Sequence, residues 1–191
     1  MSRYAFLVDT YRTERLKILG VWSQIPDDSM PVRPEPRARS PLEHMVHQCL
    51  SEDGWMTGML GIAVSLPALP AQETRLALLA HYAAVSEQRL TALEARSDEW
   101  FEETTQFFDV SRSRAWVLTR RIAHSAHHRG QLTAYLRVLG RELYSTYGPT
   151  ADTGGLFQNG ARVIYRYGLP DDVALPIAAA QPVTERPDRQ K

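Results

Sequence analysis

The sequence predicts an all-α fold, a four-helix bundle followed by an irregular C-terminal extension. Four long segments have apolar residues at helical spacing, and stretches rich in proline or glycine separate them. The chain has 191 residues, of which 43% are hydrophobic, which is enough for one domain with a sizeable core but not for two. Helices of this length joined by loops favour a bundle of antiparallel type.

The first helix is expected over residues 4–24 and should end before Pro26, because a proline ring cannot continue a helix. Four prolines fall in the stretch 26–40, which is therefore predicted to be a stiff linker.

The second helix should begin at Ser40 and Pro41, an N-cap residue followed by proline at the first helical position, and continue to about residue 64. A third helix is expected over residues 72–96, where leucines form one stripe. Residues 97–109 are predicted to form an acidic, aromatic connection.

The longest helix is expected over residues 111–139, with Gly140 as the glycine that closes it. Residues 1–140 would then form the bundle, and residues 141–180 an irregular extension packed on it. Within the extension, residues 145–160 are rich in glycine. The sequence does not assign this segment a role, and capping of the pocket and extension of a dimer contact are the two alternatives. Residues 181–191 lack apolar periodicity and are predicted to be a disordered tail.

Charge and composition exclude several classes of protein. Lysine plus arginine balance aspartate plus glutamate at 22 each, which argues against a general nucleic-acid or membrane-surface binder. The longest apolar stretch, 59–71, is too short to span a bilayer, and no export signal is visible at the N-terminus. The single cysteine, Cys49, cannot form an internal disulfide, so we expect a cytoplasmic protein.

Five of the six histidines fall in two short windows. On a helix, His124 and His128 are one turn apart, so their imidazoles can converge on one metal ion. The second helix offers His47 as a third ligand, with His44 one turn earlier. Three imidazoles suit zinc, nickel, copper or iron and leave a coordination position free. On spacing alone, ordinary histidines at a helix interface are an equally good interpretation.

Three segments carry a resemblance to a known family. They are LEHMVHQCLSEDGWM at 42–56, SRSRAWV at 111–117 and HSAHHRGQL at 124–132, and the H-x-x-x-H-R-G-Q-L pattern in the last is the most specific. Together they strongly resemble the DinB/YfiT-like family of metalloenzymes. The resemblance covers about residues 4–140.

The resemblance implies an up-down-down-up four-helix bundle that forms a homodimer. It also implies one divalent metal ion, with zinc or nickel expected, held by His47, His124 and His128. His44 remains an alternative to His47, which is preferred because the spacing to the following Ser-Glu-Asp and Trp55 fits the family better.

Charge is unevenly distributed around the proposed ligands. Residues 97–111 contain five acids and no basic residue, whereas residues 110–141 contain seven arginines and no acid. Arg121 and Arg129 each lie within one turn of a proposed ligand, so either can hold a substrate carboxylate near the metal. A preference for small anionic substrates is therefore predicted.

Other side chains near the ligands in sequence are weaker candidates. His127 is expected to orient a ligand or substrate, or to pack at a helix interface. Gln131 and Tyr135 continue the face of His124 and His128 and can orient a ligand. The carboxylates nearest to His47, Glu52 and Asp53, can orient an imidazole or act as a general base.

Members of the resembled family with a known activity mostly catalyse transfer or isomerisation with a low-molecular-weight thiol. The resemblance therefore implies a metal-dependent enzyme of thiol-transferase type that acts on small electrophilic compounds, with the thiol as co-substrate. The alternative is a non-catalytic metal-binding protein of a stress response. No nucleic-acid or membrane partner is expected.

Overall fold

The fold is taken from a computed structural model, which describes residues 2–141. The extension expected at 141–180, its glycine-rich segment 145–160 and the tail 181–191 lie outside the described residues beyond Arg141. The described part is predominantly helical, which confirms the predicted fold class.

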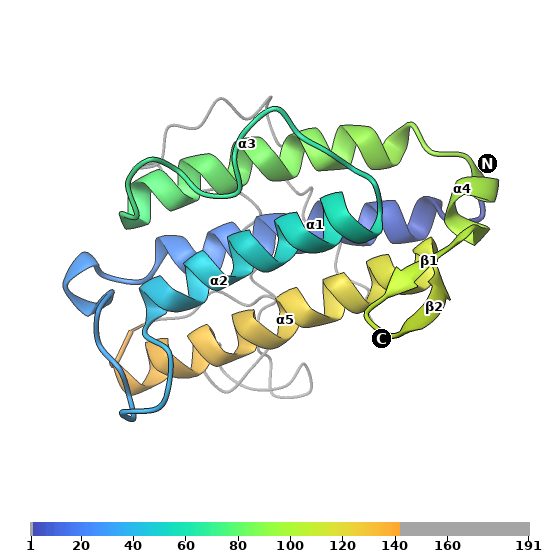
Figure 1. Ribbon diagram of the computed structural model, residues 1–191. Helices are drawn as coiled ribbons and strands as arrows, with labels where there is room; N and C mark the ends of the chain where they lie inside the picture. The colour runs from blue at the N-terminus through green and yellow to red at the C-terminus, as the bar shows by residue number, and fades with distance from the viewer. Residues whose placement is uncertain (1, 142–191) are drawn as a thin grey trace, which may run out of the picture.

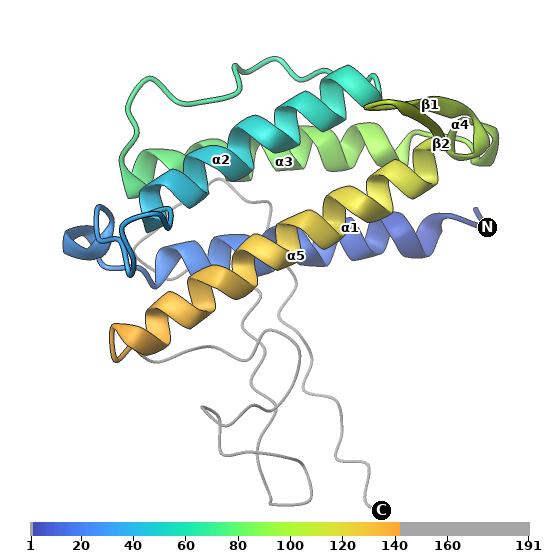
Figure 2. The same cartoon turned by 60° about the horizontal axis from the view of Figure 1, so that its bottom comes forward.

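Four long helices form the bundle: α1 (Ala5–Ser23), α2 (Pro41–Asp53), α3 (Arg75–Glu94) and α5 (Arg114–Val138). Helix α1 packs against α3 and α5, and α2 packs against the same two helices from the other side. In Figure 1, α1 and α5 run from right to left, whereas α2 and α3 run from left to right. Figure 2 shows the long connection that lets α3 follow α2 in the same direction.

Helix α2 begins and α5 ends as their sequences predict. Ser40 caps α2 through a capping box with Glu43, in which each side chain binds the backbone N–H of the other. At the end of α5, Gly140 has a φ of +66°, and the Arg141 N–H donates to the Leu136 carbonyl. This is a Schellman motif, which needs a residue that tolerates the left-handed conformation.

The end of α2 differs from the prediction. The α-helix stops at Asp53, a π-helical turn η2 (Gly54–Met59) follows, and no helix continues to residue 64. The Leu60 N–H donates to the carbonyl of Trp55, five residues earlier, which widens the last turn. Gly61 then has a φ of +66°, and the chain turns away.

The acidic, aromatic connection expected at 97–109 contains regular structure that was not predicted. This segment contains a short helix, α4 (Asp98–Glu102), and a strand, β1 (Thr104–Phe107), which pairs with β2 (Val110–Ser113) as an antiparallel hairpin. Helix α5 consequently starts at Arg114 and not at residue 111. A short 3-10 turn, η1 (Asp27–Ser29), also interrupts the linker at 26–40.

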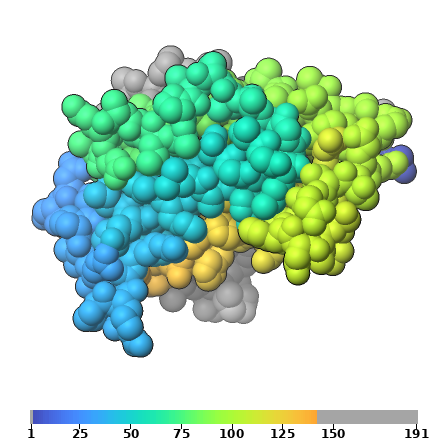
Figure 3. Space-filling model, viewed as in Figure 1, coloured from blue at the N-terminus to red at the C-terminus, as the bar shows by residue number. Residues whose placement is uncertain are grey.

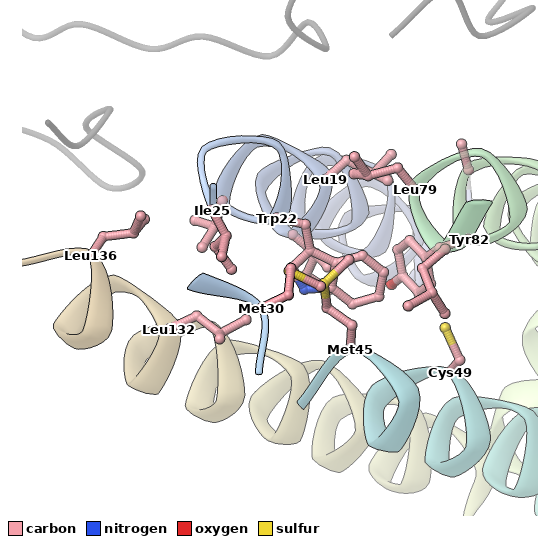
Figure 4. Close-up of a cluster of buried hydrophobic side chains, with 14 residues drawn as sticks. Leu19, Trp22, Ile25, Met30, Met45, Cys49, Leu79, Tyr82, Leu132 and Leu136 are labelled. Carbon is pink, nitrogen blue, oxygen red and sulfur yellow. The ribbon is translucent and has the colours of Figure 1, made fainter. Parts of the chain in front are cut away.

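The core consists of two apolar clusters separated by a polar layer. The first cluster, around Trp22, fills the end of the bundle near the linker (Figure 4). The second, around Phe101, fills the end near the hairpin. Between them lie buried charged side chains from all four long helices, namely Glu14, Arg15, Glu52, Arg89, Arg121 and Arg129. The histidine windows border this layer.

None of the helices in the described part of the chain is both long enough and apolar enough to cross a membrane.

Candidate metal centre

Three histidines from two helices converge at the middle of the bundle. His47 of α2 and the pair His124 and His128 of α5 place one ring nitrogen each within 4.8 Å of the others. The ring centroids of His124 and His128 are 4.5 Å apart, and that of His47 is 4.7 Å from His128. The residues that the resemblance implies as ligands are therefore brought together.

His44, the alternative to His47, does not belong to this cluster. Its ring is 2% exposed and packs between His128 and Tyr135, at centroid distances of 5.4 and 5.6 Å. Its Nδ1 has no hydrogen-bond partner within residues 2–141. The helical offset between His44 and His47 thus sends one ring toward the core and the other toward the cluster.

One pair of these nitrogen atoms already has the spacing that a tetrahedral ion requires. The Nε2 atoms of His124 and His128 are 3.3 Å apart. Two nitrogens at 2.0–2.1 Å from one tetrahedral ion lie about 3.4 Å apart. The donor set and this spacing fit a divalent transition-metal ion.

Gln131 fixes the orientation of one imidazole. The His128 Nδ1 lies 2.7 Å from the Gln131 Oε1, one turn further along α5. Because a carboxamide oxygen only accepts hydrogen bonds, Nδ1 carries the proton and the Nε2 lone pair faces His124. Gln131 therefore has the geometry of a residue that orients a ligand.

The protein holds these imidazoles in their neutral form. Burial and then the positive charge of Arg121 lower the pKa of His124 to about 3. Burial, together with the neighbouring histidines and Arg39, lowers the pKa of His128 to about 4 despite its bond to Gln131. Burial also lowers the pKa of His47. Neutral imidazole is the form that binds metal ions.

Arg121 lies beside the cluster but is held by the protein itself. Its guanidinium donates to Ser51 Oγ at 2.9 Å and Ser125 Oγ at 2.8 Å, and it sits 5.5 Å over the ring of Trp55. The side chain is 1% exposed. The hydrogen bonds of Arg121 are therefore directed mainly into the bundle. They hold its positive charge at a fixed position beside His124.

Glu52 does not contact the imidazoles. Its carboxylate accepts hydrogen bonds from the hydroxyls of Tyr11 at 2.7 Å and Tyr82 at 2.9 Å, and it is paired with Arg89. The neighbouring Asp53 accepts from Arg89 at 2.8 Å. Both carboxylates are structural in this arrangement, so the expected orienting or general-base role near His47 has no support in the geometry.

Arg129 and His127 also differ from their expected placement. Arg129 is buried and ion-paired with Glu14 of α1, which places its charge inside the bundle. His127 is exposed, and its ring lies edge-on to that of His128 on the same helix at 5.1 Å, so among residues 2–141 it does not pack at a helix interface as expected. Cys49 is buried as expected, and burial raises the pKa of its thiol to about 12.

Tyr135 connects the site to a residue that the sequence did not single out. The Tyr135 hydroxyl donates to the backbone carbonyl of Arg39 at 2.9 Å. The exposed Arg39 guanidinium has no ion-pair partner among the described residues, and it lowers the pKa of His44, His47 and His128. Arg39 is therefore an exposed positive charge near the histidines. Its position depends on the conformation of the linker, which the sequence pattern does not indicate.

Aromatic side chains border the other side of the cluster. Trp55 of η2 lies 5.4 Å from the ring of His124 and contacts Phe107 and Phe108 of the hairpin. In Figure 3, η2 at the end of α2 lies beside the hairpin segment on one face of the molecule, with the edge of α5 below them. This aromatic group was not predicted from the sequence, because its two phenylalanines lie on a hairpin that the sequence did not indicate.

The fold and the site define a class, a helical bundle with a three-histidine cluster between two helices. Within that class, the DinB family model matches residues 1–155, and the chain belongs to the DinB family.

Two solved structures have a similar fold. A DinB-like protein from Bacillus cereus is 18% identical with a TM-score of 0.61, and the match covers 70% of this chain and 91% of that one. A DinB-like protein from Bacillus subtilis is 17% identical with a TM-score of 0.55, covering 71% and 92%. No curated protein sequence matches the chain.

Proposed function

We propose that the protein is a divalent-metal-dependent enzyme of thiol-transferase type, which joins a low-molecular-weight thiol to a small electrophilic compound. The observation that carries the proposal is the convergence of three imidazole nitrogens from His47, His124 and His128. No other histidine, cysteine or acidic residue joins this cluster within residues 2–141. Three protein ligands leave a coordination position for a thiol or water.

The residues around the cluster suit this chemistry. A divalent ion at an open site, zinc or nickel in this proposal, lowers the pKa of a bound thiol and so provides a nucleophile at neutral pH. Gln131 holds His128 in the tautomer that presents Nε2. The fixed charge of Arg121 favours an anionic group such as a thiolate beside His124, and Trp55 shields that imidazole from water on one side.

The second candidate is a non-catalytic metal-binding protein of a stress response. A closed coordination shell would favour it, with His44 or a carboxylate as the fourth ligand. His44 instead packs against Tyr135, and Glu52 is bound by two tyrosines and an arginine. These placements support the open site and therefore the enzyme.

The first test is metal stoichiometry. Wild-type protein dialysed against zinc should retain one ion per chain, and His47→Ala and His124→Ala should lose it. His81→Ala is the control, because His81 lies outside the cluster and binds the Pro67 carbonyl. No retained metal in the wild type, or full retention in both cluster variants, would contradict the proposal.

The second test separates the enzyme from the non-catalytic protein. Zinc-loaded and metal-free protein are incubated with a cysteine-derived thiol and a chlorodinitrobenzene electrophile, and conjugate formation is followed by absorbance. Conjugation that requires the metal supports the enzyme. Stoichiometric metal without turnover over a panel of thiols and electrophiles supports the alternative.

A further inference from the structure

Three aromatic side chains next to the histidines form a continuous surface, which we call the aromatic ledge. It consists of Trp55, Phe107 and Phe108. The Trp55 ring is 5.2 Å from Phe107 and 6.2 Å from Phe108, and both contacts are edge-on. On its other side, Trp55 meets the ring of His124 at 5.4 Å. The ledge therefore begins at the candidate metal centre and extends outward to the tip of the hairpin.

The ledge is held in place by the fold. Strand β1 is tied to η2 because the Thr105 hydroxyl donates to the Met59 carbonyl at 2.6 Å. Phe107 is supported from behind by Trp116 of α5 at 5.0 Å. The Arg121 guanidinium over Trp55 fixes the tryptophan from the core side. An apolar surface prepared in this way loses little freedom when a ligand binds.

The position of Phe108 is not explained by a contribution to the stability of the fold. It is 66% exposed, so its ring gains little from burial. Its φ of +50° lies in the left-handed region, at the first position of a two-residue hairpin turn where glycine or asparagine is the usual residue. Backbone strain combined with an exposed aromatic ring points to a role in binding.

We propose that the aromatic ledge binds a planar apolar group of the substrate, an aromatic ring or a conjugated chain, while the reacting end of the substrate lies at the three histidines. The proposal deepens the proposed function and rests on it for the position of the reacting end. The chemical basis is that aromatic edges and faces recognise flat rings by geometry as well as by area, which saturated rings cannot match. Substrates of this class would be small aromatic or conjugated electrophiles.

The test uses matched ligands and matched variants. Benzohydroxamate and cyclohexanecarbohydroxamate share one metal-binding group and differ in the flatness of the ring. Zinc-loaded wild-type protein should bind the aromatic ligand about three- to tenfold more tightly by calorimetry. Phe108→Ala should remove most of that preference without changing the zinc stoichiometry. The control is Phe6→Ala, because Phe6 on α1 is 67% exposed and makes no aromatic contact among the described residues.

A second measurement does not depend on metal. Saturation-transfer NMR compares benzamide with cyclohexanecarboxamide on metal-free protein, and a signal for benzamide that Phe108→Ala abolishes supports the ledge. Equal binding of both rings, no binding of either, or a preference that survives in Phe108→Ala would overturn the proposal. If Phe108→Ala keeps the preference for the aromatic ligand and also changes the oligomeric state, the ledge is a subunit contact and not a ligand site. Absence of zinc binding would contradict the proposed function, while the metal-free measurement would still test the ledge.

Discussion

The His128 Nδ1 lies 2.7 Å from the Gln131 Oε1, so a residue one helical turn away sets which nitrogen of His128 is available as a ligand. Residues that orient a ligating imidazole typically contribute 10- to 100-fold to metal affinity. Gln131→Ala should therefore weaken zinc binding by about that factor, measured by competition with a chromophoric chelator. Gln131→Glu restores an acceptor and should bind zinc at least as tightly as the wild type. Equal affinity in wild type and Gln131→Ala would contradict this role.

Glu52 is expected to be important for stability. The carboxylate accepts from Tyr11 and Tyr82 and faces Arg89 and Arg121 at sites that are almost fully buried. Removing one partner of a buried ion pair leaves an uncompensated charge and costs about 3–5 kcal/mol.

Urea unfolding of Glu52→Gln measures this loss. The control is Glu94→Gln, which breaks an exposed pair with Arg12 and should cost at most about 1 kcal/mol. A loss in Glu52→Gln no larger than in the control would show that the polar layer contributes little.

The stability of the metal-free protein should depend on pH through the histidines. An unfolded histidine has a pKa of about 6.5, whereas burial lowers the pKa of His44 and His128 to about 4 and that of His124 to about 3. Between these pKa values the unfolded state binds more protons than the folded state. The free energy of unfolding is therefore highest, as far as these histidines are concerned, above about pH 6.5, and it falls as the pH decreases below that value. Urea unfolding between pH 7.5 and 5 should show this slope, and His124→Ala should make it shallower. An unchanged slope in that variant would contradict the prediction.

Arg39 replaces Arg129 as the arginine expected to attract anionic substrates. Its guanidinium lowers the pKa of His44, His47 and His128, so Arg39→Gln should raise those pKa values in NMR titrations of metal-free protein. The control is Arg37→Gln, because Arg37 is 91% exposed and paired with Glu35.

The same two variants test ligand charge. With zinc bound, Arg39→Gln should weaken binding of a carboxylate-bearing hydroxamate more than that of a neutral one, because only the charged ligand loses an attractive interaction. Equal losses for both ligands would show that Arg39 does not select anions.

The sequence allowed the bundle and the pairing of His124 with His128 to be predicted because both depend on local spacing, whereas His47 as the third ligand came from the family resemblance. His124 and His128 share a face wherever a helix forms, and Ser40 and Gly140 mark helix ends through short-range hydrogen bonds. Helix geometry alone could not decide between His44 and His47, because that choice depends on the rotation of α2 relative to α5. That rotation depends on packing across the whole bundle.

The hairpin and the placement of Arg39 could not be predicted in the same way. The strands β1 and β2 have four residues each, too few for a clear alternation of apolar and polar side chains. Arg39 is positioned by Tyr135, 96 residues away in the sequence, and by the course of a proline-rich linker. Such long-range contacts leave no periodic signal.

The polar layer has a consequence for how the helices are aligned. The Glu52 carboxylate of α2 contacts side chains from the other three long helices. It accepts hydrogen bonds from Tyr11 of α1 and Tyr82 of α3, and it faces Arg89 of α3 and Arg121 of α5. Apolar burial in the two clusters is non-directional, so by itself it fixes the position of one helix along another less strictly than hydrogen bonds and ion pairs do. A slide at the polar layer would leave a buried charge without its partners, so the contacts of Glu52 oppose such a slide between α2 and the other three long helices. These contacts thereby help to keep His47 level with His124 and His128.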